Sequence, residues 1–139
     1  MYHAVESDFE KVKEIFYLHK KWFPHIRTDY MKRMIAKKNL ILENDVVITY
    51  NFYKRKQKIG DVQAYKDDCI LHQIAAKGKG TASDVLQNFF KYVNRRVYLS
   101  VRSDNDIAKN FYLRNNMKLI GKTSWAKGTL PGDVYVYNG

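Results

Sequence analysis

The stretch that decides the fold lies in the middle of the chain and reads Ile74-Ala75-Ala76-Lys77-Gly78-Lys79-Gly80-Thr81-Ala82-Ser83. An apolar, strand-like run enters it, and an amphipathic, helix-like run leaves it. Glycine adopts a positive φ without steric cost and lets another molecule approach the backbone. A helix that begins here presents N–H groups without helical partners at the positive end of its dipole. The order strand, glycine turn and helix therefore predicts a phosphate-binding site, and the two lysines of the turn add positive charge beside it.

Length and composition indicate one domain that spans residues 1–139. Hydrophobic residues make up 45% of the chain, which is enough for a core and argues against disorder. The single cysteine excludes a disulfide within the chain and fits a reducing compartment. No apolar run approaches the ~20 residues of a membrane span, and the N-terminus lacks the basic and apolar segments of a signal peptide. We therefore expect a cytoplasmic protein with no membrane partner.

The formal net charge of +11 is large for a chain of 139 residues. It predicts long-range attraction to polyanions such as nucleic acids. Two simpler interpretations stay open: a surface that serves solubility, and partial neutralisation by a bound anionic ligand. The basic cluster at residues 54–58 also has two interpretations: a solvated loop or strand end, or a contact with a polyanion.

The spacing of apolar residues predicts elements in the order β-α-α-β-β-β-α-β-α-β-β, a mixed α/β sheet in one domain. Strands are expected at residues 2–5, 40–42, 46–50, 69–76, 97–101, 117–123 and 134–137. Helices are expected at residues 8–21 with Ser7 as N-cap, after Thr28 or Asp29 as N-cap, at residues 82–92, and from an N-cap at Ser103 or Asp104 to about Asn115. The strand at 69–76 is apolar on both faces, which predicts burial on both sides.

Two stretches match the motifs of a known enzyme family. The first, Lys77-Gly78-Lys79-Gly80-Thr81-Ala82, is similar to a pyrophosphate loop of pattern Gln/Arg-x-x-Gly-x-Gly/Ala. The second runs from Asn105 to Met117 and is similar to a later motif, Asn-x-x-Ala-x-x-Phe-Tyr followed by Gly-Phe. Together they resemble the GNAT superfamily of acyl-CoA-dependent N-acyltransferases over residues 69–123. No P-loop or dinucleotide-binding glycine pattern competes with this interpretation.

The chain departs from the family pattern at several positions. Lysine stands in the basic position of the loop, and the loop itself is short. Asn116-Met117 replaces Gly-Phe, which the fold tolerates because asparagine adopts the left-handed region and methionine fills apolar space. Ile70 occupies the position on the central strand where many family members carry a glutamate general base.

The resemblance implies a single-domain α/β (α+β) fold with a mixed, mostly antiparallel central sheet flanked by helices. It also implies an N-acetyltransferase in which an amine attacks acetyl-CoA, the cosubstrate, directly. The strand end would hold the pantetheine arm, the loop amides would hold the pyrophosphate, and Asn105 would help to fix the pantetheine. The implied coenzyme-binding residues are Ile74, Ala75, Ala76, Lys77, Gly78, Lys79, Gly80, Thr81, Ala82 and Asn105.

Tyr112 and His72 are the candidate catalytic residues. Tyr112 stands at the tyrosine position of the second motif, and a phenol with a pKa near ~10 is able to protonate a departing thiolate. The alternative is a tyrosine that only packs on the apolar stripe of its helix. His72 shares a strand face with Ile70, and its imidazole suits deprotonation of an amine. The alternatives are a core histidine for His72 and Asp68 as the base.

No metal site is expected, because His3, His19 and His25 show no metal-ligand spacing with one another or with Cys69. Cys69 is expected to pack as a small hydrophobic residue.

The acceptor is the least defined part of the prediction. A protein of this charge repels small polyamines, which weakly favours an amine carried by a polyanion such as nucleic acid. Lysines and arginines at 54–58 and 95–96 would contact phosphates, and exposed tyrosines or Trp125 would stack on bases. A nucleic-acid-binding module that has lost catalysis and a plain interaction protein remain the two alternatives.

Overall fold

The computed structural model describes residues 1–139, which form two compact units. The first unit contains residues 1–50 and 72–89, and the second contains residues 51–71 and 90–139. Strand β2 (Val46–Phe52), strand β5 (Cys69–Ala76) and helix α3 (Ala82–Val93) each contribute residues to both units. None of the helices combines the length and apolar character needed to cross a membrane. The assignment of one domain stays a prediction.

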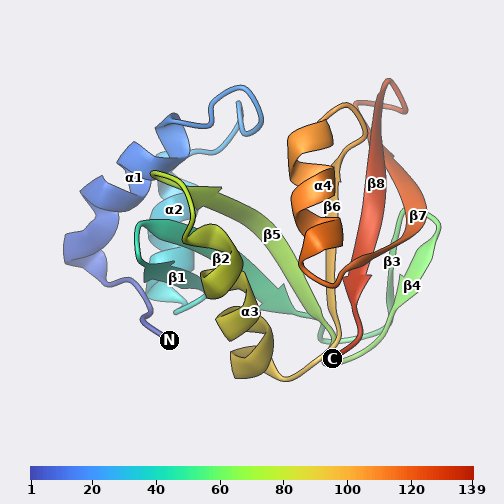
Figure 1. The fold of residues 1–139 in the computed structure, drawn as a ribbon, viewed down its shortest axis with the longest axis horizontal. Coiled ribbons are helices and arrows are strands. Elements are labelled where there is room, and N and C mark those ends of the chain that lie inside the picture. Colours follow the sequence, from blue (N-terminus) through green and yellow to red (C-terminus); the bar gives the residue numbers. More distant parts are fainter. The chain divides into compact units, whose positions relative to one another are not determined.

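The first unit packs two short helices beside a hairpin. Helices α1 (Phe9–Tyr17) and α2 (Thr28–Ala36) lie next to each other (Figure 1). Strand β1 (Leu40–Glu43) pairs antiparallel with β2 through a turn in which Asn44 and Asp45 have φ of 49° and 61°. Asparagine and aspartate tolerate this left-handed conformation, so the turn closes without glycine. The buried core of this unit consists of Ala4, Val12, Ile15, Phe16, Met31, Met34, Ile35, Leu40, Val47 and Ala75.

The second unit is built mainly from strands. Strand β6 (Val97–Arg102) pairs antiparallel with β8 (Leu130–Tyr137), which pairs antiparallel with β7 (Lys118–Trp125). The start of β5 pairs parallel with β6, and helix α4 (Asp106–Arg114) lies against β7. A small hairpin of β3 (Gln57–Ile59) and β4 (Val62–Ala64) lies beside β7 (Figure 1).

The strand order along hydrogen-bonded neighbours is β1-β2-β5-β6-β8-β7, with β3-β4 as a separate two-stranded sheet. The predicted fold class, a mixed and mostly antiparallel sheet flanked by helices, is confirmed.

Several local predictions were wrong. The segment 2–5 makes only one isolated bridge, His3 to Ile41, instead of a strand. Helix α1 ends at Tyr17, four residues early, and a short 3₁₀ turn (Glu6–Asp8) precedes it. Ser7 does not cap the helix; the Asp8 carboxylate instead accepts a hydrogen bond of 2.9 Å from the Val5 amide.

Two further predictions were wrong in detail. The N-caps of two helices differ from the prediction: Asn105, not Ser103 or Asp104, caps α4, and Arg27, not Thr28 or Asp29, is the N-cap of α2. Strand β5 is not buried on both sides: Cys69, Leu71 and Ala75 are buried, whereas His72 is exposed. The strand is therefore accessible on the face that carries His72.

The C-terminal end of α4 confirms the predicted roles of Asn116 and Met117. Asn116 has a φ of +67°, in the left-handed region that glycine usually occupies in this motif. Met117 is 3% exposed, and its amide donates to the carbonyl of Tyr112 at 3.2 Å. Asparagine thus adopts the left-handed conformation at this position, and methionine fills the apolar space that follows it.

Candidate functional site

The glycine turn of the first unit has the open, left-handed backbone that the sequence predicts. Strand β5 ends at Ala76 and helix α3 begins at Ala82, with Gly78 at φ +97° and Gly80 at φ +92° between them. A Cβ atom added at either glycine would meet no atom within 4 Å. The positive φ, and not crowding inside the protein, is therefore the reason that these positions favour glycine. The space beside them is open to another molecule.

The amides of this turn fit an anionic ligand. The first N–H of the helix that reaches a carbonyl is that of Val85, which donates to Thr81 at 3.1 Å. Gly78, Lys79 and Gly80 are exposed, and their amides donate no hydrogen bond within the protein. Exposed amides followed by the N-terminus of a 12-residue helix are the chemistry that a diphosphate requires. The residues present therefore fit the diphosphate of a coenzyme.

Neighbouring segments fix both ends of the glycine turn. The Lys77 amide donates to the carbonyl of Asp45 at 2.8 Å, and the Thr81 hydroxyl donates to the carbonyl of Asn44 at 3.2 Å. His19 contacts the carbonyl of Ala76 through Nε2 at 2.8 Å. The β1–β2 turn thus supports the glycine turn on either side of its two glycines.

The side chain of Lys77 is engaged by helix α1. Its ammonium lies 2.5 Å from the Glu14 carboxylate, and both side chains are about half exposed. The hydrogen bond and charge of Glu14 raise the pKa of Lys77. Lys11 of the same helix pairs with Asp45 at 2.5 Å. Helix α1 is therefore linked by two ion pairs to the segments that carry and support the glycine turn.

His72 and Gln73 lie on opposite faces of β5. His72 is exposed, but atoms crowded around its ring partly desolvate it and lower the pKa of the imidazole. A neutral imidazole at pH 7 is able to accept a proton. The Gln73 carbonyl accepts hydrogen bonds from Tyr30, at 2.9 Å, and from the buried hydroxyl of Thr49. Sequence reasoning missed this polar cluster, because its members come from three separate elements.

Helix α4 in the second unit carries Asn105 and Tyr112. The Asn105 side-chain oxygen caps the helix by accepting from the Ala108 amide at 3.2 Å. Burial raises the pKa of the Tyr112 phenol, so it stays protonated throughout the neutral range. Tyr112 is 8% exposed, and its ring lies against Phe111 and Tyr135. Its hydroxyl makes no hydrogen bond within the protein, yet no unsatisfied side-chain oxygen is fully buried. The hydroxyl oxygen is therefore not completely enclosed by the protein.

A buried carboxylate attaches α4 to strand β8, and sequence reasoning missed it. Asp133 is 1% exposed and lies 2.7 Å from both the Ser103 hydroxyl and the Lys122 ammonium. Lys109 of α4 lies 3.2 Å from the same carboxylate. Burial alone would raise the pKa of Asp133, but hydrogen bonds from these partners outweigh it and lower the pKa to about 2. The only signal in the sequence was an aspartate directly before the apolar run 134–136.

Asp68, the alternative base, has a structural role, and Cys69 packs as a small buried residue as the sequence predicts. Asp68 accepts from the Tyr65 amide at 2.9 Å and pairs with Arg96 at 3.3 Å, which leaves it poorly suited to act as a base. Cys69 is fully buried, and burial raises the pKa of its thiol to about 12. The ring of Trp125, which was considered for base stacking, packs against Gly132. A Cβ added to Gly132 would come within 2.5 Å of that ring.

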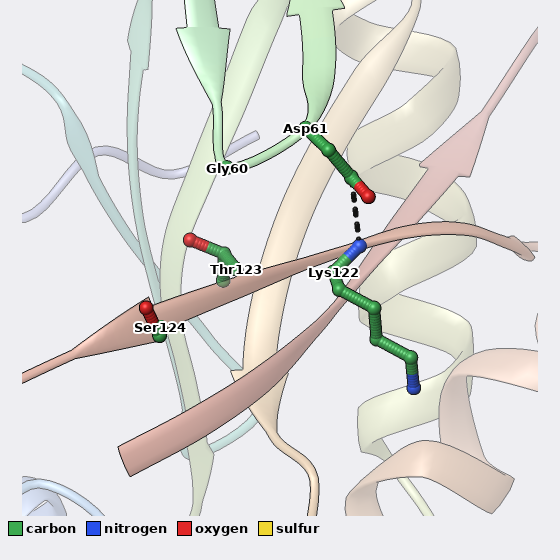
Figure 2. Close-up of a pocket in the computed structure, with 5 residues that line it drawn as sticks. All are labelled: Gly60, Asp61, Lys122, Thr123 and Ser124. Carbon is green, nitrogen blue, oxygen red and sulfur yellow. Dashed lines mark hydrogen bonds between the residues drawn. The ribbon is translucent and has the colours of Figure 1, made fainter. Parts of the chain in front are cut away.

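A shallow hollow in the second unit contains none of the predicted site residues. Gly60, Asp61, Lys122, Thr123 and Ser124 line it (Figure 2). The Lys122 amide donates to the Asp61 carboxylate at 2.8 Å, while the Lys122 ammonium points away from it (Figure 2). The hollow marks where the β3–β4 turn attaches to β7.

Comparison with solved structures identifies the fold. An acetyltransferase of the GNAT family from Bacillus cereus matches with a TM-score of 0.76 at 15% identity, over 99% of this chain and 94% of that one. NAA60 from Arabidopsis thaliana, in complex with acetyl-CoA, matches with a TM-score of 0.74 at 14% identity, over 99% and 98% of the two chains. The chain has the GNAT acetyltransferase fold.

A third GNAT-fold structure, a ribosomal-protein-alanine N-acetyltransferase from Brucella melitensis, matches with a TM-score of 0.73 at 10% identity, over 99% and 98% of the chains. No family model and no curated protein matches the sequence. At these identities the likeness concerns the fold.

Proposed function

We propose that the protein is an N-acetyltransferase that transfers the acetyl group of acetyl-CoA to a primary amine by direct attack. The observation that carries the proposal is the glycine turn: exposed amides and two glycines at positive φ stand between β5 and α3 in a GNAT fold. Two of the similar structures have acetyl-CoA or CoA in complex, those of NAA60 and of the NatC complex. A single buried cysteine fits a reducing compartment such as the cytoplasm.

Backbone groups make most of the proposed contacts with the coenzyme. The amides from Gly78 to Ala82 bind the diphosphate, and the backbone of Ile74, Ala75 and Ala76 binds the pantetheine arm. The Asn105 side-chain oxygen accepts the hydrogen bond that caps α4, and its amide nitrogen is the group proposed to contact the pantetheine. Lys77 and Lys79 add positive charge next to the diphosphate.

His72 and Tyr112 perform the proton chemistry in this proposal. His72 takes a proton from the acceptor ammonium, directly or through a water, because its lowered pKa keeps the imidazole neutral at pH 7. Tyr112 donates a hydrogen bond to the departing thiolate. Because burial raises the pKa of Tyr112, complete proton transfer from the phenol is uphill, and stabilisation of the thiolate by hydrogen bonding is its main contribution.

The acceptor is proposed to be an amine carried by a polyanion, which the net charge of +11 supports. The second candidate function is a nucleic-acid-binding module with weak or no catalysis. It is favoured by Ile70 in place of the glutamate base together with this charge. The two candidates differ in turnover, since only the enzyme releases thiol from acetyl-CoA.

The test is a thiol-release assay with acetyl-CoA against a panel of amines that includes peptide N-termini, polyamines and aminoacylated RNA. Tyr112→Phe should reduce kcat at least ten-fold while the Kd for CoA stays unchanged, the pattern of a group that acts in the transition state. Tyr137→Phe is the matched control, because Tyr137 stacks on Phe90 and phenylalanine preserves that contact. His72→Gln should lower kcat and remove the fall in rate at acidic pH. Binding of CoA without turnover on any amine would favour the second candidate.

A further inference from the structure

Basic and aromatic side chains gather in the second unit where β2 ends, β5 begins and α3 ends. Phe52 and Tyr65 are 41% and 48% exposed. The Arg95 guanidinium lies 5.4 Å from the centre of the Phe52 ring, and that of Arg96 lies 6.0 Å from the centre of the Tyr65 ring. The fold thus joins two segments, around residues 52–68 and 95–96, that the sequence separates. The basic–aromatic surface comprises Phe52, Lys54, Arg55, Tyr65, Arg95 and Arg96.

A hydrogen-bonded frame holds these rings in place. The Tyr53 amide donates to the Asp68 carbonyl at 2.9 Å, and the Asp67 amide donates to the Tyr53 carbonyl at 2.8 Å. The buried Asp68 carboxylate accepts from the Tyr65 amide at 2.9 Å and from Arg96 at 3.3 Å. These bonds use backbone groups and the side chains of Asp68 and Arg96, and none of them uses the two rings, which stay 41% and 48% exposed.

The charge of this surface exceeds what its acidic residues neutralise. Residues 52–68 contain five lysines and arginines and three aspartates, and residues 91–96 contain three lysines and arginines and no acidic residue. The net charge of these 23 residues is therefore +5, almost half of the total of +11. Lys54, Arg55, Lys56 and Lys66 are all exposed. The surface is a strong local attractor for a chain of negative charges.

We infer that the basic–aromatic surface binds single-stranded nucleic acid, with unpaired bases stacked on Phe52 and Tyr65 and phosphates paired with Lys54, Arg55 and Arg95. Lysine alone would suit any polyanion, but exposed rings flanked by arginines suit unstacked bases, which a duplex does not offer. The inference deepens the acceptor part of the proposed function. It rests on that function for its biological meaning, while the binding itself needs neither acetyl-CoA nor turnover.

Fluorescence anisotropy of a labelled 12-nucleotide oligouridine, without acetyl-CoA, tests the inference between 50 and 200 mM salt. Tyr65→Ala should weaken binding about ten-fold, and Tyr65→Phe should leave it unchanged, because only the ring is needed for stacking. The triple variant Lys54→Gln, Arg55→Gln, Arg95→Gln should reduce the salt slope by about 2, at ~0.7 per lost phosphate contact. The matched control replaces three exposed lysines of the first unit, Lys20, Lys21 and Lys37, by glutamine and should bind like the wild type.

Three results would overturn the inference: equal affinity for a duplex or for polyglutamate, an unchanged affinity of Tyr65→Ala, or an equal loss in the control triple variant. Each would mean a surface that attracts any polyanion, with no preference for unpaired bases. Thermal unfolding of every variant shows whether it is folded, and Tyr65→Leu, which keeps an apolar side chain but has no ring, takes the place of Tyr65→Ala if that variant is unstable. Since no arm contains coenzyme, a failure here leaves the thiol-release assay to decide the proposed function separately.

Discussion

Asp133→Asn should destabilise the protein in a pH-dependent way. In the folded protein, hydrogen bonds from Lys122, Ser103 and Lys109 outweigh the effect of burial and lower the pKa of Asp133 from 3.8 to about 2. At ~1.36 kcal/mol per pH unit, this difference contributes about 2.4 kcal/mol to the free energy of unfolding at neutral pH. The carboxylate is 1% exposed, so solvent does not screen these contacts strongly. Asparagine removes the charge but keeps an oxygen that accepts from Ser103.

The sign of the pH dependence follows from the lowered pKa. A group whose pKa is lower in the folded state stabilises the protein above its unfolded pKa, and this contribution is lost as the pH falls through the folded value. The difference in unfolding free energy between wild type and Asp133→Asn should therefore be largest near pH 6. It should shrink by about 1 kcal/mol at pH 3, where the unfolded chain is largely protonated at this position.

Urea unfolding of both proteins at pH 6 and pH 3 measures this difference. Asp106→Asn is the matched control, because Asp106 contacts the same Lys109 at 4.0 Å but its side chain is 85% exposed. Exposed ion pairs contribute little, so the control should unfold almost like the wild type at both pH values. A gap between wild type and Asp133→Asn that is the same at pH 6 and pH 3 would refute the assignment of Asp133 as an ionised anchor of α4.

Three further predictions concern the glycine turn, the hairpin and the thiol. Glu14→Gln should bind CoA about two- to five-fold more tightly, because the substitution frees Lys77 from an exposed ion pair and removes a negative charge beside the diphosphate site. Calorimetry with CoA measures the affinity, and Glu10→Gln is the control. Gly60→Ala should lower the free energy of unfolding by at least ~2 kcal/mol, because Gly60 has a φ of +59° and a Cβ there would come within 2.1 Å of a backbone oxygen of β7. Urea unfolding measures this change. Cys69 should react with a thiol reagent at pH 8 only after urea unfolds the protein, because burial raises its pKa to about 12.

Each of these predictions has a contradicting result. Equal gains for Glu14→Gln and Glu10→Gln would mean that only overall charge affects the coenzyme. An unchanged midpoint for Gly60→Ala would mean that the hairpin does not attach closely to β7. Fast reaction of Cys69 in the native protein would contradict its burial.

The glycine turn and the elements around it were predictable because their signals are local. Two glycines within three residues and a strong apolar period in 82–93 determine the turn and α3 almost independently of the rest of the chain. The left-handed conformation of Asn116 was also predicted correctly, because the tendency of asparagine to adopt it depends on that residue alone. Such signals survive although the three solved structures described above are 15% identical to this chain or less.

The missed features depend on contacts between distant residues. Ser103 and Asp133 are 30 positions apart, so no window of sequence shows their hydrogen bond. The β3–β4 hairpin was missed although Gly60-Asp61 is a turn signal, because exposed lysines obscure the apolar alternation of β3. The expected partner of Lys77 was a phosphate, whereas its side chain in the structure lies against Glu14 of α1, 63 positions away.

Nuclear magnetic resonance of the ¹⁵N-labelled protein during titration with CoA tests the central claim most directly, because it reports on each backbone amide. The amide signals of residues 78–82 should shift and saturate, and pantetheine, which has no diphosphate, should leave them almost unchanged. Shifts confined to other residues, or none at millimolar CoA, would contradict the assignment of this glycine turn as the diphosphate site.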